Sequence, residues 1–319
     1  MKKIRIDLLD FADNAVKTDQ FLYKALAGRF QLELCDQPDF LLYSHGGHTH
    51  RLQSGVKIFF SGESMLPNFQ ECDYSAGPLK LNDARHLHLP WYVIFGEPQE
   101  IIKKNDDHRQ ILAAKTKFCS FVIGGYNPRK NGNRVEFFRK LSRYKKVDSA
   151  GTKFNNIGSP IPFGSRNKIE FLRPYKFNIA FENRALAGYT TEKIFEPMIA
   201  RCLPIYWGDP DINEHFNPRS FLNRADFPSD EALIEKIIEL DNDDEKYLEY
   251  MRQPYFHNDQ PTQFFSHERI QDFFEKIFTT KIIPVAQRKG WKLRLRRMLF
   301  GRWVLVKPYH WHKMNDVGW

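Results

Sequence analysis

The stretch FNIAFENRALAGYTTEKI, residues 177–194, decides the fold class of this chain. It begins with an apolar run that is typical of a buried strand, and it then changes abruptly to polar residues and glycine, which indicates a turn. Glu192 and Lys193 follow in the first turn of a helix that we expect over 191–201. A strand that turns directly into a helix is typical of a parallel α/β sheet, in which ligands bind beyond the carboxyl ends of the strands.

Strand and helix alternate on both sides of this stretch. In the second half of the chain we predict strands at 118–123, 146–148, 176–181 and 203–207, with helices near 132–144, 165–172, 191–201, 229–241, 243–252 and 266–278. In the first third, a helix near 19–28 and apolar runs near 3–9, 30–35, 39–43 and 56–60 indicate another parallel sheet. The sequence therefore predicts an α/β protein with two Rossmann-like halves that face a cleft.

The polar stretch from Pro98 to Arg109 indicates where one half gives way to the other. A chain of 319 residues is long enough for two medium-sized domains. We expect a first α/β domain at 1–110, a second at 111–280, and a basic, aromatic tail at 281–319.

The composition indicates a folded protein with an anionic partner. A hydrophobic share of 42% and an aromatic share of 15% are enough to bury a core. The formal net charge of +9 favours contact with a nucleotide diphosphate, an anionic lipid or nucleic acid, and charge alone does not choose among them.

Three sequence features predict a cytoplasmic protein. The four cysteines lie far apart without any C-x-x-C spacing, which indicates reduced thiols rather than a disulfide framework. Charges at Arg5, Asp7 and Asp10 interrupt any apolar signal-peptide core, so the first segment is expected to be a strand. No apolar run approaches the ~20 residues that are needed to cross a bilayer.

The turn before the helix at 191–201 suits a phosphate group. A helix N-terminus exposes N–H groups and carries a partial positive charge, and Lys193 adds a full charge there. Glu192 beside it is placed to contact a sugar or ribose hydroxyl. The alternative, from these residues alone, is that Thr190 caps the helix and that Glu192 and Lys193 are solvated.

A longer pattern surrounds these residues. The block F-E-N-(x)5-Y-x-T-E-K is matched by Phe181, Glu182, Asn183, Tyr189, Thr191, Glu192 and Lys193. It is followed by IYWGDP at 205–210 and FNPRSF at 216–221. On these linked blocks, the chain resembles glycosyltransferase family ten and, within it, the bacterial α1,3/4-fucosyltransferases that use GDP-fucose.

The resemblance implies a glycosyltransferase B-type fold and inverting transfer of L-fucose from GDP-fucose to a GlcNAc-containing glycan, with no cofactor and no metal. It implies that the domain at 1–110 binds the acceptor and that the domain at 111–280 binds the donor. The donor-binding residues that it implies are Arg134, Asn183, Tyr189, Glu192 and Lys193. Arg134 would bind the pyrophosphate, for which a guanidinium is suited because it pairs two oxygens at once. An exposed helix-end cation is the alternative for this arginine.

The segment SGESMLPNF, residues 61–69, is similar to the family block T-G-E-N-(x)2-P-N-F, whose glutamate is the proposed catalytic base. Glu63 and Glu192 are therefore the candidate catalytic residues. Without the resemblance, a carboxylate at a loop tip is ordinarily just solvated. Ser61 and Ser64 stand where the family usually has Thr and Asn, and Thr190 stands where valine is common.

The candidate acceptor-binding residues are His50, Trp91 and Tyr92. The first ends the segment SHGGHTH at 44–50, which is similar to a family S-x-x-G-x-x-H stretch, and a histidine that stabilises its own loop is the alternative. The segment holds three histidines but no carboxylate or cysteine, so we predict no metal site there. The two aromatic residues offer a stacking surface for a sugar or, alternatively, belong to the core.

The tail at 291–319 carries four of the six tryptophans among basic residues, which suits peripheral contact with the inner face of a bacterial membrane. An arm packed on its own domain or on a neighbouring protein is the alternative. A different class of function is also open: a non-catalytic basic and aromatic protein that binds anionic glycan or nucleic acid. Because the motif charges fall at strand ends rather than on a sheet face, we favour the transferase without a nucleic-acid partner. A transferase of another sugar nucleotide is a further alternative.

Overall fold

The computed structural model describes residues 3–11, 17, 20–125 and 128–288. The chain forms two compact units. Of the described residues, the first unit contains those from Lys3 to Gly77, Leu81–Leu89 and those from Ser266 to Arg288, and the second contains those of Pro78–Lys80 and Pro90–Phe265. The chain thus enters the second unit near residue 90 rather than at the expected residue 110, and the segment 266–280 belongs to the first unit.

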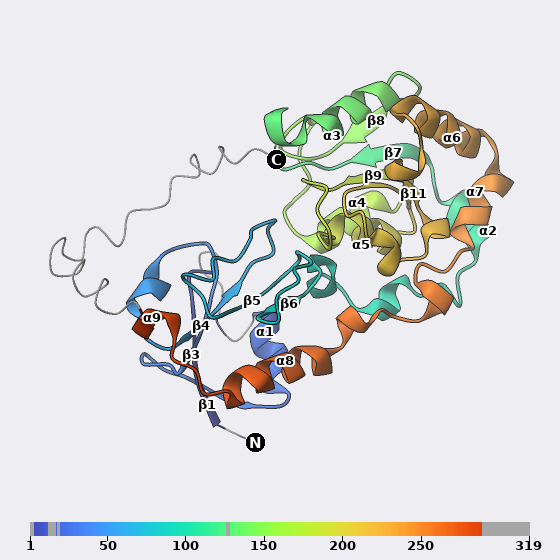
Figure 1. Ribbon diagram of the computed structural model, residues 1–319. Coiled ribbons are helices and arrows are strands. Elements are labelled where there is room, and N and C mark those ends of the chain that lie inside the picture. Colours follow the sequence, from blue (N-terminus) through green and yellow to red (C-terminus); the bar gives the residue numbers. More distant parts are fainter. Residues whose placement is uncertain (1–2, 12–16, 18–19, 126–127, 289–319) are drawn as a thin grey trace. The chain divides into compact units, whose positions relative to one another are not determined.

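The first unit is built on a parallel sheet with the strand order β2-β1-β3-β4-β5-β6 in the described residues (Figure 1). The strands are β1 (Lys3–Leu9), β2 (Gln31–Leu34), β3 (Phe40–Tyr43), β4 (Val56–Phe60), β5 (Tyr74–Gly77) and β6 (His86–His88). All five residues of β4 are buried, as expected for a central strand covered on both faces. The residue that follows β4 begins the loop that carries Glu63.

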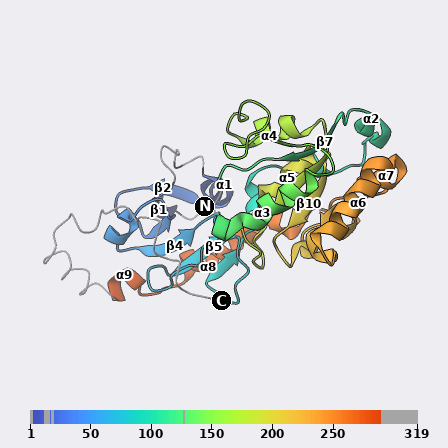
Figure 2. The ribbon, with the colours of Figure 1, turned by 90° about the horizontal axis from the view of Figure 1, so that it is seen from above.

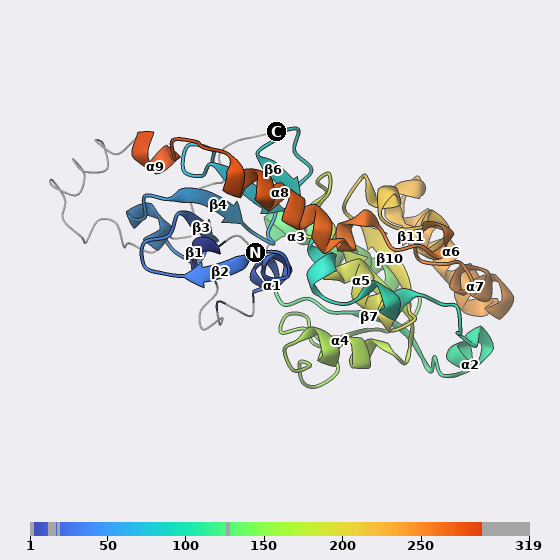
Figure 3. The ribbon, with the colours of Figure 1, turned by 90° about the horizontal axis from the view of Figure 1, so that it is seen from below.

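Two helices that are far apart in the sequence pack together on this sheet. The helix α1 (Phe21–Ala27) contacts α8 (His267–Thr279) (Figure 3). The chain reaches α8 after the second unit, but α8 belongs to the first unit. Phe278 of α8 packs its ring against those of Phe30 and Phe40. The short helix α9 (Val285–Arg288) then contacts β4, and the N–H of Val285 donates to Asp73. These contacts are the physical reason why the segment 266–280 belongs to the first unit.

The second unit has a parallel sheet with the strand order β11-β10-β9-β7-β8 in the described residues. The strands are β7 (Lys117–Phe121), β8 (Val147–Ser149), β9 (Tyr175–Phe181), β10 (Leu203–Trp207) and β11 (Leu222–Asn223). On one face lie α3 (Pro128–Leu141), α6 (Asp230–Asn242) and α7 (Asp244–Met251), and on the other lie α4 (Ser165–Leu172) and α5 (Glu192–Ile199) (Figure 2). This is the doubly wound arrangement that the sequence predicts.

The remaining helical segments are short. They are α2 (His108–Ala113) and the 3-10 helices Thr49–Leu52, Trp91–Ile94, Pro98–Ile101, Ile212–Glu214, Pro218–Ser220, Arg224–Asp226, His257–Asp259 and Gln263–Phe265. Within the described part of the chain, no helix combines the length and the apolar character that crossing a membrane requires.

The four cysteines are not joined by disulfides. Three of them, Cys72, Cys119 and Cys202, are buried as predicted, and burial raises the pKa of the Cys202 thiol to about 11. Cys35 is only partly buried. The predicted tail at 291–319 lies outside the described residues.

Candidate active site

The strand β9 leads directly into the strongest candidate site. All seven of its residues are buried, and the chain leaves the sheet at Glu182. The following turn includes Gly188, whose φ of 79° lies in the region that favours glycine. The helix α5 then begins with Thr191 as its N-cap, and the hydroxyl of this residue accepts from the backbone N–H of Lys193. The helix N-terminus therefore lies at the carboxyl edge of the sheet, as the sequence predicts.

Glu182 holds the start of α5 in place through hydrogen bonds to Thr191. Its carboxylate is fully buried and accepts hydrogen bonds from the backbone N–H of Thr191 at 2.8 Å and from the Thr191 hydroxyl at 2.8 Å. The Nζ atom of Lys193 lies 3.2 Å from Oε2 of the same carboxylate. Burial lowers the pKa of Lys193, but Glu182 and Glu192 raise it by more, so the pKa lies above its usual range. Lys193 therefore carries its positive charge although its side chain is only 19% exposed.

Arg134 reaches the same place from α3. It is 4% exposed, and its Nε atom is buried with no hydrogen-bond partner among the described residues. Burial lowers the pKa of Arg134, which Glu182 and Tyr189 partly offset, and a guanidinium still remains charged at neutral pH. A buried donor without a partner costs about 1–3 kcal/mol, so this nitrogen indicates that an acceptor belongs beside it. The alternative of an exposed helix-end cation is wrong.

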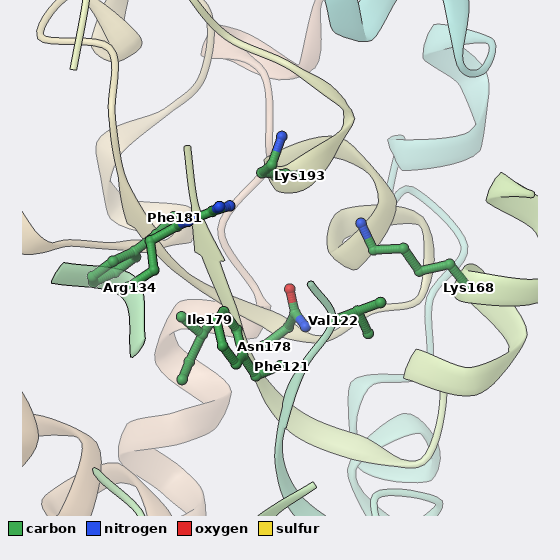
Figure 4. Close-up of a pocket in the computed structure, with 8 residues that line it drawn as sticks. All are labelled: Phe121, Val122, Arg134, Lys168, Asn178, Ile179, Phe181 and Lys193. Atoms are coloured by element: carbon green, nitrogen blue, oxygen red, sulfur yellow. The ribbon is translucent and has the colours of Figure 1, made fainter. Parts of the chain in front are cut away.

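These cations line one small pocket (Figure 4). Its lining residues are Phe121, Val122, Arg134, Lys168, Asn178, Ile179, Phe181 and Lys193. The free space within it is only about 10 Å³, which corresponds to roughly one water molecule. The pocket therefore marks the point where the cations converge, and a nucleotide diphosphate would have to displace side chains to enter it.

Lys168 was not predicted from the sequence. It extends from α4 into the pocket, and its Nζ atom lies 2.6 Å from Oε2 of Glu196, which is 2% exposed. Glu196 lies one helical turn after Glu192 on α5, and this i,i+4 spacing of carboxylates is the one signal that could have revealed a charged helix face. Nothing in the local sequence singles out Lys168, because only the packing of α4 against α5 brings it here.

Glu192 is a carboxylate at the edge of the pocket. Its side chain is 23% exposed, and one oxygen lies 3.4 Å from the Nζ atom of Lys193. Burial raises the pKa of Glu192, but Lys193 and Lys168 lower it by more, to about 2. Glu192 is therefore ionised near neutral pH and can accept hydrogen bonds from hydroxyl groups, but it cannot supply a proton.

The other two predicted donor-binding residues lie on the same turn. Asn183 directly follows Glu182 and is half-buried. Tyr189 is 2% exposed and lies close enough to Arg134 and Lys193 to affect both electrostatically. The structure thus brings all five predicted donor-binding residues to one edge of the second sheet.

Asp209 holds the turn between β9 and α5 in place. Its fully buried carboxylate accepts from the backbone N–H of Gly188 at 2.8 Å, from the hydroxyl of Thr190 at 2.7 Å and from the N–H of Asp211 at 2.9 Å. His215 lies on the far side of Asp209, with its Nε2 atom 3.6 Å from Oδ2.

In the first unit, Glu63 is exposed on the loop after β4. Its backbone N–H donates to Oγ of Ser61 at 3.1 Å, and that oxygen also lies 3.2 Å from Nδ1 of His45. The N–H of Met65 donates to the Glu63 carbonyl at 2.7 Å and closes a tight turn. The backbone of Glu63 is thus fixed by its own loop while its carboxylate faces solvent, as a residue that takes a proton from a substrate requires.

His50, a predicted acceptor-binding residue, is 4% exposed. Its Nδ1 atom lies 2.6 Å from Oδ2 of Asp10, and its ring stacks on Tyr43 with the centroids 3.9 Å apart. Burial raises the pKa of Asp10, but hydrogen bonds from His50 and Thr49 lower it by more, to about 2. These contacts support the alternative in which His50 stabilises its own loop.

The two aromatic candidates belong to the second unit and differ in exposure. Tyr92 is fully buried, and its hydroxyl lies 3.1 Å from Nδ1 of His215 and 3.2 Å from Oγ1 of Thr262. A ring without exposed surface cannot stack on a sugar, so in this structure Tyr92 is a core residue and not an acceptor platform. Trp91 is partly exposed, and its backbone N–H donates to the carbonyl of Thr190 at 2.9 Å. That bond ties residue 91 to the donor-side turn.

Among the residues that the structure describes, no group of three or more His, Cys, Asp or Glu side chains is placed to hold a metal ion.

A doubly wound sheet with cations and a helix N-terminus at its carboxyl edge, in a chain that also contains a second parallel sheet, is typical of nucleotide-sugar glycosyltransferases of the B type. Comparison with known families agrees with this class. Residues 112–277 match the C-terminal domain of glycosyltransferase family 10 (fucosyltransferase), and residues 6–95 match the N-terminal domain of the α-(1,3)-fucosyltransferase FucT. The chain belongs to glycosyltransferase family 10.

Individual relatives support the assignment. The chain is 29% identical to the α-(1,3)-fucosyltransferase FucT of Helicobacter pylori over 273 residues, which is 72% of this chain and 55% of that protein. It is 35% identical to a putative fucosyltransferase of Acanthamoeba polyphaga mimivirus over 164 residues, which is 49% of this chain and 27% of that protein. The chain thus spans about half or less of the length of these curated relatives.

A crystal structure of an α1,3-fucosyltransferase with GDP-fucose superposes with a TM-score of 0.73 at 26% identity. The match covers 89% of this chain and 93% of that one. The predicted fold class, two parallel α/β units of the glycosyltransferase B type, is therefore confirmed.

Proposed function

We propose that the protein transfers L-fucose from GDP-fucose to a GlcNAc-containing glycan of the N-acetyllactosamine type, forming an α1,3 or α1,4 linkage. The observation that carries this proposal is the pair of cations at the start of α5, the buried Arg134 and the partly buried Lys193, with the Nε atom of Arg134 lacking a partner among the described residues. Such a site suits a diphosphate. The choice of guanosine and fucose follows from the solved relative that holds GDP-fucose.

The reaction is a single displacement with inversion. The acceptor hydroxyl oxygen forms a bond to the anomeric carbon of fucose while the bond from that carbon to the phosphate oxygen breaks, and GDP leaves with the electron pair. Glu63 takes the proton of the acceptor hydroxyl, which makes the attacking oxygen a better nucleophile. Its exposed carboxylate on a fixed backbone supports this role.

The donor-side residues stabilise the leaving group. Negative charge grows on the diphosphate as the bond breaks, and Arg134, Lys193 and the N–H groups of α5 are placed to stabilise it. Glu192 and Asn183 bind the sugar and ribose portions, and the buried Tyr189 supports the turn that carries them. Because fixed cations supply the charge that a divalent ion would otherwise supply, we propose that no metal is required.

The experiment is release of GDP by the purified protein from GDP-fucose in the presence of N-acetyllactosamine, with and without EDTA. We expect turnover that needs the acceptor and resists EDTA, and a product whose fucose is α-linked, which shows inversion of the β-linked donor. GDP-mannose and UDP-galactose serve as matched donors that should not react. Absence of turnover with every donor and acceptor would contradict the proposal and favour a non-catalytic binding protein, whereas turnover with another donor would correct the sugar.

We further propose that the protein acts in the cytoplasm on surface polysaccharide of a bacterium, held at the inner face of the membrane by residues 291–319. The support is the alternation of basic residues and tryptophan in that segment. The test is co-sedimentation with vesicles of phosphatidylglycerol compared with vesicles of phosphatidylcholine. Equal binding to both vesicles, or to neither, would contradict it.

A further inference from the structure

The charges around the donor pocket balance one another. The described side chains comprise three cations and three carboxylates, Arg134, Lys168, Lys193, Glu182, Glu192 and Glu196. Each carboxylate lies close to a lysine: 3.2 Å separates Glu182 from Lys193, 3.4 Å separates Glu192 from Lys193, and 2.6 Å separates Glu196 from Lys168. With all six groups ionised, the formal charge of the cluster is zero before any ligand binds.

Binding of a diphosphate would add negative charge to this formally neutral cluster. The diphosphate of a sugar nucleotide carries two negative charges at neutral pH. It would enter a site in which both lysines already have carboxylate partners, whereas the Nε atom of Arg134 has none among the described residues. Charges a few ångströms apart interact much more strongly in a partly buried site than in water. Uptake of a positive charge, or neutralisation of one carboxylate, would therefore favour binding of the diphosphate.

Glu182 is the carboxylate best placed to become neutral. It is fully buried, whereas Glu192 is 23% exposed and has a pKa of about 2. The charged and titratable groups around Glu182 are Lys193 and Glu192 on α5, Arg134 on α3 and Tyr206 on β10. Burial raises the pKa of Glu182 above its usual range, and Lys193 is the largest influence that lowers it. When Lys193 turns to a phosphate, that influence weakens.

The packing around Glu182 leaves little room for another cation. A Cβ atom at Gly208 would lie 2.5 Å from Cγ of Glu182, so the backbone directly after β10 packs closely against this side chain. The hydroxyl and N–H of Thr191 occupy the other side. A proton is the one positive charge that needs no additional space.

We propose that GDP-fucose binds together with a proton from solvent, which Oε2 of Glu182 takes up as Lys193 leaves it for the diphosphate. Glu182 is then a positioning residue with two states. As a carboxylate it holds Lys193 ready at the pocket, and as a neutral acid it keeps its hydrogen bonds with Thr191 without repelling the diphosphate. The inference rests on the proposed function, because it requires a sugar-nucleotide diphosphate as the ligand.

The test is isothermal titration calorimetry of GDP-fucose, without acceptor, in buffers of different ionisation enthalpy at one pH. GDP-fucose is the right probe because its diphosphate is esterified at both ends and does not itself titrate near neutral pH. The slope of binding enthalpy against ionisation enthalpy gives the number of protons taken up. We expect a positive slope for the wild type, and an affinity that falls as pH rises, by up to about tenfold per pH unit.

Three variants decide which group takes the proton. Glu182→Gln should give a slope of zero and an affinity that does not change with pH, while Glu196→Gln and the surface control Glu239→Gln should keep the wild-type slope. Binding of the wild type without proton uptake, or uptake that persists in Glu182→Gln, would overturn the inference. If no GDP-fucose binds at all, the proposed function fails instead.

A melting curve shows whether Glu182→Gln still folds. If it does not, infrared difference spectroscopy of the wild type replaces it. The band of a protonated carboxyl group should appear when GDP-fucose is added, and its absence would equally overturn the inference.

Discussion

Thr190→Val tests how the donor-side turn is held, because it removes one hydroxyl and keeps the shape of the side chain. The hydroxyl donates to Oδ2 of Asp209 at 2.7 Å, and both side chains are fully buried. After the change, Nε2 of His215 still lies 3.6 Å from this oxygen, which is beyond hydrogen-bond distance. A buried acceptor that loses its donor costs about 1–3 kcal/mol. We therefore expect a loss of about 2 kcal/mol, which lowers the Tm by roughly 4–8 °C for a unit of this size.

The pH dependence of this loss gives a second readout. Burial raises the pKa of Asp209, although the bond from Thr190 lowers it. A group whose pKa is higher in the folded state makes the folded protein bind more protons, so its contribution is full below the unfolded pKa and declines as pH rises through the folded pKa. Removing the Thr190 hydroxyl raises the pKa of Asp209 further. The deficit in Tm should therefore be larger at about pH 7 than at about pH 4, where the unfolded carboxyl is itself half protonated.

The assay is thermal unfolding followed by circular dichroism, with Thr152→Val as the matched control. The hydroxyl of Thr152 also donates a hydrogen bond, to the carbonyl of Gly124 at 2.8 Å, but it is exposed, so water replaces the lost bond. We expect a change of less than about 0.5 kcal/mol there. Equal losses in the two variants, or a Thr190→Val deficit that does not depend on pH, would refute the view that Asp209 is a buried carboxylate held by Thr190.

Other changes test the roles of single residues in the proposed reaction. Glu63→Gln should lower kcat by about a hundredfold or more with little change in the KM for GDP-fucose, whereas the control variant Glu97→Gln should keep the wild-type kcat. A near-normal kcat in Glu63→Gln would show that this residue is not the base. Arg134→Ala and Lys193→Ala should each weaken GDP binding by about 1.5–3 kcal/mol, which is about tenfold to a hundredfold, and calorimetry showing wild-type affinity would place the diphosphate elsewhere. Truncation after Arg288 keeps α9 and should reduce co-sedimentation with anionic vesicles. Unchanged co-sedimentation would contradict the membrane contact and favour a tail that packs on protein.

The sequence was sufficient to predict the strands and helices that have strong patterns. The strand at 203–207 and the helix at 165–172 have the predicted bounds, and β9 begins one residue earlier than expected. The missed strands, β5, β6 and β11, are two to four residues long, and β5 consists of the residues YSAG. Such segments lack an apolar pattern of their own, and neighbouring strands rather than side chains determine that they join the sheet.

The residues of the candidate site likewise fall into those that the sequence could predict and those that it could not. Glu192 and Lys193 could be predicted because their place after a buried strand puts them at a helix start. Lys168 could not, because its approach to the pocket depends on how α4 packs against α5. For Tyr92, the sequence shows an aromatic residue but not which face of it is covered, and the structure surrounds the ring with Phe195, His215, Phe216 and Phe265.

The carboxylates beside the pocket allow its three cations to lie close together. Three cations brought together with no counter-charge would repel one another, and the two lysines would lose a proton before Arg134 because an ammonium is more easily neutralised than a guanidinium. Glu182 and Glu192 prevent this by keeping the pKa of Lys193 high. In effect they occupy the electrostatic position of the phosphates. On the proposed function, a diphosphate would exchange one set of oxygen partners for another instead of creating the charged site.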